Sequence, residues 1–334
     1  MEKKPVPSCR QTFPSAEARE FPTIVNMAVC HGMCPCRCVH CPVGTISPDK
    51  RAERFGQKFA ELALYDKVSR EIGAHPSAAL RVHGVGEPLL WPLLPDALAV
   101  GKSNGARTWI FTSAVTRDAV LLDAVCENVD IVEVSVNSTD PVDYRATKGI
   151  DAFALVTENI RHIRRRIDAG VSVRLVVSRV QSDVPAADDQ FREYWIGTGL
   201  VDDAFVRSYH TYNDILPNLP DDGPATTHQP CLVHWARFNV TVDGLAIVCF
   251  NELFKRRLDP SVVLGDVNAQ SITEIWHGPK LEAIRKAELA ADYSALDAPE
   301  ALPCRNCTFC QPLGDNRPTS ESQLTHLDTA ENGA

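Results

Sequence analysis

A group of five cysteines lies within twelve residues near the N-terminus, at Cys30, Cys34, Cys36, Cys38 and Cys41. Only Cys34, Cys38 and Cys41 fit the spacing C-x3-C-x2-C, because a set that starts at Cys30 needs a cysteine at position 37, where Arg37 stands. Three thiolates on one short loop can hold three irons of a [4Fe–4S] cluster and leave the fourth iron open to a small molecule. The spacing therefore predicts chemistry at an open iron.

A second group of cysteines lies in the C-terminal part of the chain, at Cys231, Cys249, Cys304, Cys307 and Cys310. One fully ligated [4Fe–4S] cluster takes four of these five thiolates, and a tetrahedral zinc site is the rival interpretation. The remaining cysteine is either a buried spare thiol or a thiol that gives a hydrogen atom to a substrate radical.

The composition of the chain is that of a globular protein. The chain has 334 residues, 44% of them hydrophobic and 23% charged, enough for a large domain and a smaller one. The sequence contains no apolar run long enough to span a bilayer and no signal peptide. Clustered cysteines in such a chain favour metal binding in a reducing compartment, so we expect a cytoplasmic protein without a membrane partner.

The formal net charge of −9 argues against a nucleic-acid partner. An acidic surface is compatible with a cationic small-molecule substrate, and it also serves simple solubility.

Short apolar stretches alternate with helical patterns from Phe21 onward. This predicts an α/β protein with a parallel sheet and right-handed crossovers. The candidate strands are Thr23–Val29, Ala79–His83, Thr108–Thr112, Ile131–Val136, Ser172–Val177 and Ala204–Ser208, and the helical patterns include Gln57–Glu71, Asp118–Asn128 and Ala152–Ala169. Six units are too few for a closed (β/α)8 barrel, so we expect a partial (β/α)6 barrel with its chemistry on the loops after the strands.

The rest of the chain divides at a proline-rich stretch near 214–230, which we interpret as a linker. A hairpin follows, with strands Arg237–Val242 and Leu245–Cys249 around Asp243-Gly244, and then a helix over Ser271–Ala290. The predicted organisation is an arm (1–20), the partial barrel (21–215), a small α+β auxiliary domain (216–312) and a disordered tail (313–334).

The cysteine loop after the first strand resembles that of the radical S-adenosylmethionine (radical SAM) enzymes. The resemblance implies that SAM chelates the open iron and is cleaved to a 5′-deoxyadenosyl radical, which takes a hydrogen atom from an unactivated C–H bond. It also implies an electron donor such as flavodoxin or ferredoxin. One position departs from the family pattern, because His40 stands where an aromatic residue is usual, and its imidazole can also pack on adenine.

The same resemblance implies further cofactor contacts. Gly84-Val-Gly86-Glu87-Pro88 resembles the motif that holds the amino group of SAM, since glycine allows close backbone approach and a carboxylate suits an ammonium. The remaining candidates follow the fourth and fifth strands of the barrel: Ser135 and Asn137 for the ribose, and Arg145 and Ser178 for the SAM carboxylate.

The C-terminal cysteines resemble the auxiliary-cluster domains of this family, called SPASM or twitch domains. A complete SPASM pattern has more cysteines and two clusters, so we expect one auxiliary [4Fe–4S] cluster here. Twitch-domain dehydrogenases imply the ligands Cys231, Cys249, Cys304 and Cys307, which frees Cys310. The chain also resembles the radical SAM epimerases of neomycin-type aminoglycosides, which implies the ligands Cys231, Cys304, Cys307 and Cys310, with Cys249 as catalytic hydrogen donor.

The expected function is therefore a radical SAM epimerase, an isomerase of antibiotic biosynthesis that inverts a sugar carbon of an aminoglycoside. The main alternative is a radical SAM dehydrogenase that oxidises an aminocyclitol alcohol, for which no thiol donor is needed. The alternative from another class is a non-catalytic iron–sulfur electron carrier, which has no use for a Gly-Glu-Pro loop or an open iron.

Overall fold

The computed structural model describes residues 20–212, 215–217 and 230–307. Most of the predicted N-terminal arm and linker, and the whole predicted tail, lie outside the described residues, as does Cys310.

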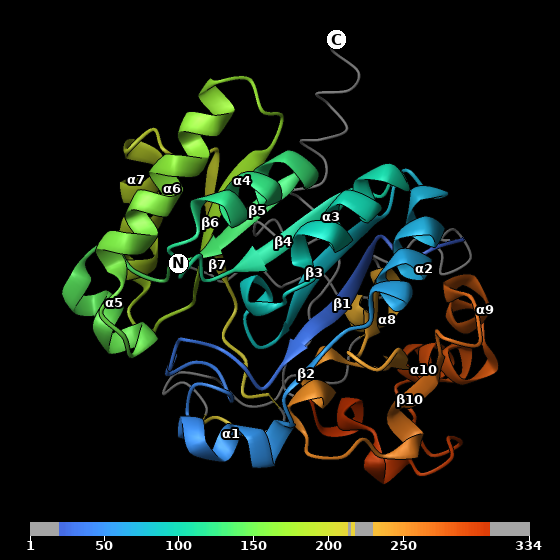
Figure 1. Cartoon of the computed structure of the whole chain (residues 1–334). Coiled ribbons are helices and arrows are strands. Elements are labelled where there is room, and N and C mark those ends of the chain that lie inside the picture. The colour runs from blue at the N-terminus through green and yellow to red at the C-terminus, as the bar shows by residue number, and fades with distance from the viewer. Residues whose placement is uncertain (1–19, 213–214, 218–229, 308–334) are drawn as a thin grey trace, which may run out of the picture.

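A sheet with both edges open forms the body of the molecule, in the order β10-β9-β8-β1-β3-β4-β5-β6-β7 (Figure 1). Six of its strands are mutually parallel neighbours, which confirms the predicted partial barrel. They are β1 (Ile24–His31), β3 (Ala79–Val85), β4 (Thr108–Thr112), β5 (Ile131–Ser135), β6 (Arg174–Val180) and β7 (Asp203–Arg207). Each predicted strand is present, with ends shifted by up to three residues.

Helices cover the outer face of this sheet, where α2, α3, α4 and α6 lie side by side (Figure 1). The crossover helices are α2 (Leu62–Gly73), α3 (Leu94–Ser103), α4 (Ala119–Asn128), α6 (Phe153–Asp168) and α7 (Pro185–Gly197), with shorter helices α1 (Pro48–Phe55), η3 (Pro88–Leu90) and α5 (Pro141–Lys148) in the loops. The helix expected from Gln57 begins only at Leu62, because Lys58–Phe59 forms a short strand, β2, antiparallel to β1.

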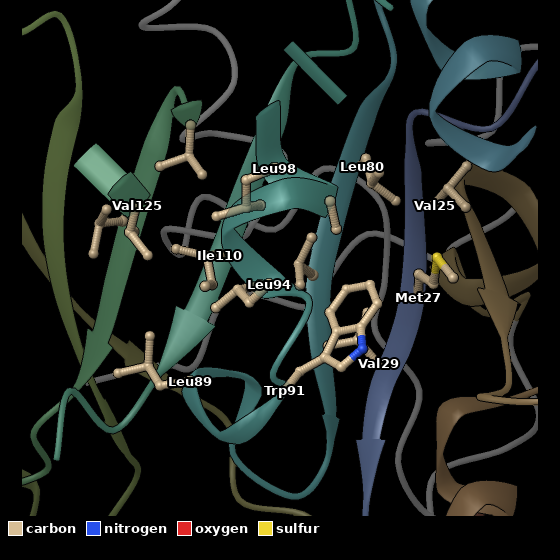
Figure 2. Packing of buried hydrophobic residues seen from close by; sticks show 14 of the residues in the cluster. Val25, Met27, Val29, Leu80, Leu89, Trp91, Leu94, Leu98, Ile110 and Val125 are labelled. Carbon is tan, nitrogen blue, oxygen red and sulfur yellow. The ribbon is translucent and has the colours of Figure 1, made fainter. Parts of the chain in front are cut away.

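Side chains alternate between the two faces of the strands, as the pleat of a sheet requires. Outward-facing residues such as Met27, Leu80 and Ile110 join the helices in the largest apolar cluster, where Leu94 and Leu98 of α3 meet them (Figure 2). Inward-facing residues form a separate small cluster of six: Ile24, Ala79, Trp109, Ile131, Val176 and Phe205.

The C-terminal part of the chain extends the same sheet instead of forming a separate one. Strand β8 (Arg237–Val240) pairs in parallel with β1, and β9 (Leu245–Ile247) and β10 (Val263–Asp266) follow antiparallel. The predicted hairpin is thus confirmed. In a partial barrel, β1 leaves a row of unpaired backbone groups, and β8 supplies their partners.

The helices of this segment gather beside β1 (Figure 1). They are α8 (Leu232–Ala236), α9 (Ile272–Trp276) and α10 (Pro279–Ala290), with one-turn helices η4 (Phe250–Phe254), η5 (Pro260–Val262), η6 (Pro299–Ala301) and η7 (Pro303–Asn306). The single helix expected over Ser271–Ala290 is therefore wrong. It is split at Gly278-Pro279, because proline cannot continue a helix but fits the first turn of a new one.

Among the described residues, no helix combines the length and apolar character needed to cross a membrane.

Candidate functional site

The cysteine loop begins directly after β1 and is held by Arg51 of α1. This arginine is only 3% exposed, and its guanidinium donates hydrogen bonds to the carbonyls of Ile46 (3.1 Å), Cys34 (2.8 Å) and Cys36 (3.0 Å). Three convergent acceptors satisfy the buried guanidinium and fix the curvature of the loop.

The structure distinguishes Cys30 from the predicted ligands. Cys30 lies within β1, its thiol faces the carbonyl of Met33 at 3.5 Å, and burial raises its pKa to about 12. A Cβ at Gly86 would lie 2.7 Å from the Cys30 sulfur and 2.5 Å from the Met33 carbonyl, so only glycine fits there. Cys30 therefore packs beneath the Gly86 loop, in agreement with its exclusion on spacing.

Cys36 does not fit the C-x3-C-x2-C spacing, but it lies next to the predicted ligands. Its thiol interacts with those of Cys34 and Cys38, and the interaction with Cys34 is the main cause that raises its pKa to about 12. The pKa of Cys38 is raised to about 11, mainly by Cys36 and burial, while His40 acts to lower it. Cys34 and Cys41 are half-buried and pack against the apolar cluster around Val43.

Glu87 begins η3 and is 2% exposed. Its carboxylate accepts four hydrogen bonds: from Leu89 N (3.1 Å), Thr112 Oγ1 (2.5 Å), Ser113 N (2.7 Å) and Ser113 Oγ (2.5 Å). The side chain thus joins the loop after β3 to the end of β4. The backbone N–H of Glu87 donates to Met33 (2.7 Å), which holds this loop against the cysteine loop.

The predicted ribose contacts meet where β5 and β6 end. Asn137 has a left-handed backbone (φ 65°), its Nδ2 donates to Ser135 Oγ (2.8 Å), and its Oδ1 accepts from Val180 N (2.8 Å). Ser178 is joined to this group through its carbonyl, which accepts from Asn137 N (3.1 Å). The structure therefore brings Ser135, Asn137 and Ser178 together.

Arg145 is not brought to these residues. Its side chain is 64% exposed on α5 and pairs with Asp151 at 2.6 Å. The basic residue that does reach Ser135 is Lys148, the last residue of the same helix, whose Nζ donates to the Ser135 carbonyl at 2.7 Å. The sequence reasoning missed Lys148, because a lysine in the last turn of a helix is usually solvent-exposed.

A charged layer crosses the inner face of the sheet above the small apolar cluster. Glu133 of β5 is fully buried and accepts from Arg207 Nε (2.8 Å) and Nη2 (2.6 Å), Arg81 Nη2 (3.2 Å) and Ser178 Oγ (2.6 Å). Burial acts to raise the pKa of Glu133, but the two arginines outweigh it and lower that pKa. The sequence held the signal for this layer, a glutamate within the apolar strand Ile131–Ser135.

The cysteines of the C-terminal segment that the structure describes lie at three short helices. Cys231 precedes α8, Cys249 precedes η4, and Cys304 and Cys307 lie in and after η7. Burial and then the nearby thiols of Cys231 and Cys307 raise the pKa of Cys249. For Cys304, burial, Glu288 and the thiols of Cys249 and Cys231 raise the pKa. These four thiols are close enough to influence one another.

Cys304 also faces a buried histidine. Its sulfur lies 3.6 Å from Nε2 of His234, whose Nδ1 lies 2.6 Å from Glu288 Oε1. The other oxygen of Glu288 accepts from Trp235 Nε1 at 2.9 Å. The sequence reasoning missed this His234–Glu288 pair, because the two residues are 54 positions apart.

The helix η4 joins the C-terminal segment to the carboxyl-terminal end of the barrel strands. Phe250, directly after Cys249, packs its ring edge-on against His83 of β3, with ring centroids 4.5 Å apart. His31 Nε2 lies 3.1 Å from the Leu253 carbonyl, and Phe254 packs on Tyr212. Cys249 itself packs against the apolar cluster around Val248 in its own segment, and the residue that follows it contacts the barrel.

In the described part of the chain, no three side chains of histidine, cysteine, aspartate or glutamate stand close enough to hold one metal ion. The donor set is nevertheless that of iron–sulfur clusters, namely several free thiols on each of two segments.

Comparisons with known proteins agree with this donor set. Residues 231–308 match the SPASM family model, described as an iron–sulfur cluster-binding domain. The match includes Cys231, Cys249, Cys304 and Cys307, and ends two residues before Cys310. No curated protein sequence matches the chain. The iron–sulfur interpretation of the C-terminal cysteines is therefore confirmed over the zinc alternative.

Several solved structures share the fold. BtrN in complex with AdoMet and 2-DOIA superposes with a TM-score of 0.52 at 17% identity, over 89% of this chain and 97% of that one. SuiB from Streptococcus suis, bound to its precursor peptide SuiA, gives a TM-score of 0.61 at 11% identity, over 83% of this chain and 70% of SuiB. The protein anSMEcpe with bound AdoMet gives 0.57 at 13% identity, over 79% and 83% of the two chains.

Residues 231–308 are therefore an iron–sulfur cluster-binding domain of the SPASM family, and the chain as a whole has the radical SAM fold that its cysteine spacing predicted.

Proposed function

We propose that this protein is a radical SAM epimerase that inverts a sugar carbon of a neomycin-type aminoglycoside. In this proposal Cys34, Cys38 and Cys41 hold the first [4Fe–4S] cluster, and the C-terminal thiols hold a second one. The barrel corresponds to about 21–215 and the auxiliary domain to about 216–312. The solved relatives support SAM binding, because two of those described above were crystallised with AdoMet.

The observation that carries the proposal is the position of Cys249. It stands at the start of η4, and the next residue, Phe250, packs against His83 on the inner face of the barrel. A hydrogen donor must lie across the substrate from the group that removes the first hydrogen atom, and the proposal assigns this position to the Cys249 thiol.

SAM bound at the first cluster supplies the radical that removes a hydrogen atom from the substrate carbon. Cys249 then gives its S–H hydrogen atom to the opposite face of that carbon, so that one C–H bond is broken and one is formed. The sulfur radical left on Cys249 regains its hydrogen atom as one electron and one proton. A reduced flavodoxin or ferredoxin would supply this electron, and also the electron that cleaves SAM.

The surrounding residues fix the geometry of this exchange. Arg51 holds the carbonyls of Cys34 and Cys36, and Glu87 ties the loop after β3 to the end of β4. We expect Ser135 and Asn137, which are joined by a hydrogen bond, to bind the ribose, and Ser178, whose carbonyl accepts from Asn137 N, to contact the SAM carboxylate. The exposed Arg145, paired with Asp151, is a less suitable partner for the SAM carboxylate than a buried group.

A radical SAM dehydrogenase is the second candidate, and one observation favours it. The thiols of Cys231 and Cys307 influence the pKa of Cys249, which supports the assignment of Cys231, Cys249, Cys304 and Cys307 as the ligands of one cluster. In that case Cys249 is a ligand, no thiol donor is needed, and the substrate is oxidised.

Two matched variants separate the candidates, each replacing one cysteine by alanine. If Cys249 is the hydrogen donor, the Cys249→Ala variant retains the iron of both clusters and still cleaves SAM, but it forms almost no epimer. Cys310→Ala then loses the iron of the second cluster. Loss of that cluster's iron in Cys249→Ala, with full iron in Cys310→Ala, contradicts the donor role and favours the dehydrogenase.

A further inference from the structure

Lys148 is a charged side chain in the interior of the protein that the proposed mechanism does not use. It is the last residue of α5, and it is 2% exposed. Its ammonium donates to the Ser135 carbonyl (2.7 Å) and to Ser135 Oγ (3.2 Å), which are both neutral acceptors. None of the carboxylates that the structure describes forms an ion pair with it. A buried ammonium is costly without a compensating negative charge, so its surroundings must supply one.

The cysteine loop is attached to the same end of the helix. Arg37 N donates to the Lys148 carbonyl at 2.8 Å, and Val39 N donates to the Thr147 carbonyl at 3.0 Å. These two residues alternate with Cys36, Cys38 and His40 along the loop. Because carbonyls at a helix C-terminus lack partners within the helix, the loop satisfies them and is fixed in place.

Gly149 makes this attachment possible. It has a left-handed backbone (φ 68°), and a Cβ on it would lie 2.7 Å from both the Cβ and the carbonyl oxygen of Arg37. Only glycine allows the helix end and the cysteine loop to approach so closely. The loop and the Lys148 ammonium are therefore held together by the backbone itself.

The electrostatic neighbours of Lys148 are the thiols of this loop. Burial acts to lower the pKa of Lys148, but Cys38, Cys36, Tyr144 and Cys34 act in the opposite direction and raise it overall. In return, Lys148 lowers the pKa of Cys36, Cys38 and Cys41 against the larger effects that raise it. The side chain thus lies next to thiols that become anionic when they bind iron.

We propose that Lys148 is a positioning residue of the first cluster. Its ammonium compensates the charge of the cluster held by Cys34, Cys38 and Cys41, and it raises the reduction potential of that cluster. The same ammonium fixes Ser135, a predicted SAM contact, relative to the loop. The inference rests on the part of the proposed function that places a cluster on this loop, and it is independent of epimerisation.

A fixed positive charge favours the more electron-rich form of a nearby cluster, and it acts strongly where water is excluded. An equivalent charge at the surface is screened by solvent and salt. Lys50 of α1 offers that comparison, because it lies on the helix after the cysteine loop and is exposed.

The test is an EPR-monitored redox titration of the reconstituted full-length protein and of Lys148→Met, Lys148→Arg and Lys50→Met. The signal of the first cluster is recognised by its change when SAM is added. We expect Lys148→Met to lower the reduced-to-oxidised ratio of this cluster on the order of tenfold at a fixed potential, or about 59 mV. Lys148→Arg and Lys50→Met should stay near wild type, and the second cluster should be unchanged in all three.

An unchanged potential in Lys148→Met with full iron content overturns the inference. If Lys148→Met loses the iron of the first cluster, the iron content of Lys148→Arg is the deciding measurement. Full iron in Lys148→Arg supports a role for the positive charge, and loss of iron in both variants overturns the inference. Wild-type protein whose spectrum does not respond to SAM contradicts the proposed function itself. If Lys148→Met shows the expected shift in potential but the wild-type protein forms no epimer, only the proposed epimerisation is contradicted.

Discussion

Glu87 shows how a predicted contact can have a structural role as well. The motif around it predicts a partner for the SAM amino group, and its carboxylate is already bound by Leu89 N, Thr112 and Ser113. A carboxylate has about four lone-pair sites, and these four bonds involve both oxygens. We therefore expect any contact of Glu87 with the SAM amino group to depend mainly on charge.

Replacement of Glu87 by glutamine removes the negative charge. Glutamine keeps the size of the side chain and one acceptor oxygen, but its amide nitrogen then faces the backbone N–H of Leu89 or of Ser113, and we expect weaker SAM binding by about tenfold, or about 1.4 kcal/mol. Iron content should be unchanged. Equilibrium binding of SAM to the reconstituted variant measures the effect, and wild-type affinity in Glu87→Gln would remove the charge of Glu87 from the site.

At the scale of the elements, the strands place the candidate site residues near their carboxyl-terminal ends, and the outer face of the sheet packs against the helices. The strands were predictable because each is a short apolar run rich in Val, Ile or Phe. The Glu133 layer was not predicted, because its partners Arg81 and Arg207 come from strands far apart in the chain. The split of the helix at Gly278-Pro279 was readable from the proline itself.

The Glu133 layer predicts a pH-dependent stability. Glu133→Gln leaves Arg81 and Arg207 without the buried carboxylate, so we expect a loss of about 3–5 kcal/mol in unfolding free energy at pH 7. The folded-state pKa of Glu133 is lowered, so its contribution is present above its ordinary pKa of 4.5 and is lost as the pH falls through the folded-state value. The difference in unfolding free energy between wild type and Glu133→Gln should therefore decrease as the pH is lowered.

Chemical denaturation followed by tryptophan fluorescence measures this difference in unfolding free energy at about pH 7, 5 and 3.5. A difference between wild type and Glu133→Gln that stays constant, or grows, toward low pH would show that the carboxylate is not the stabilising ion. Glu158→Gln is a suitable control, because Glu158 is exposed on α6 and pairs only with surface arginines.

For the molecule as a whole, the sequence specified the cysteine spacing, the parallel strands and the hairpin, because each depends on residues near one another in the chain. It did not specify that β8 would pair with β1, or that Lys148 and Cys36 would lie beside the predicted ligands. Those arrangements depend on which edges and helix ends meet in three dimensions, and no local pattern records them.

The two cysteine-bearing segments predict two clusters in one molecule. Anaerobic reconstitution should give about eight irons per chain, four for each cubane cluster. Replacing Cys34, Cys38 and Cys41 together by alanine should leave about four. A wild-type content near four would mean that only one of the two segments holds a cluster.

We propose above that the Cys249 thiol returns a hydrogen atom to the substrate radical. The most direct measurement is incubation of the reconstituted protein with SAM, a reductant and candidate aminoglycosides in D2O, followed by mass spectrometry and NMR of the product. Because a thiol hydrogen exchanges with solvent, the account predicts one deuterium at the inverted carbon. A product two mass units lighter, or an epimer without deuterium at that carbon, would contradict it.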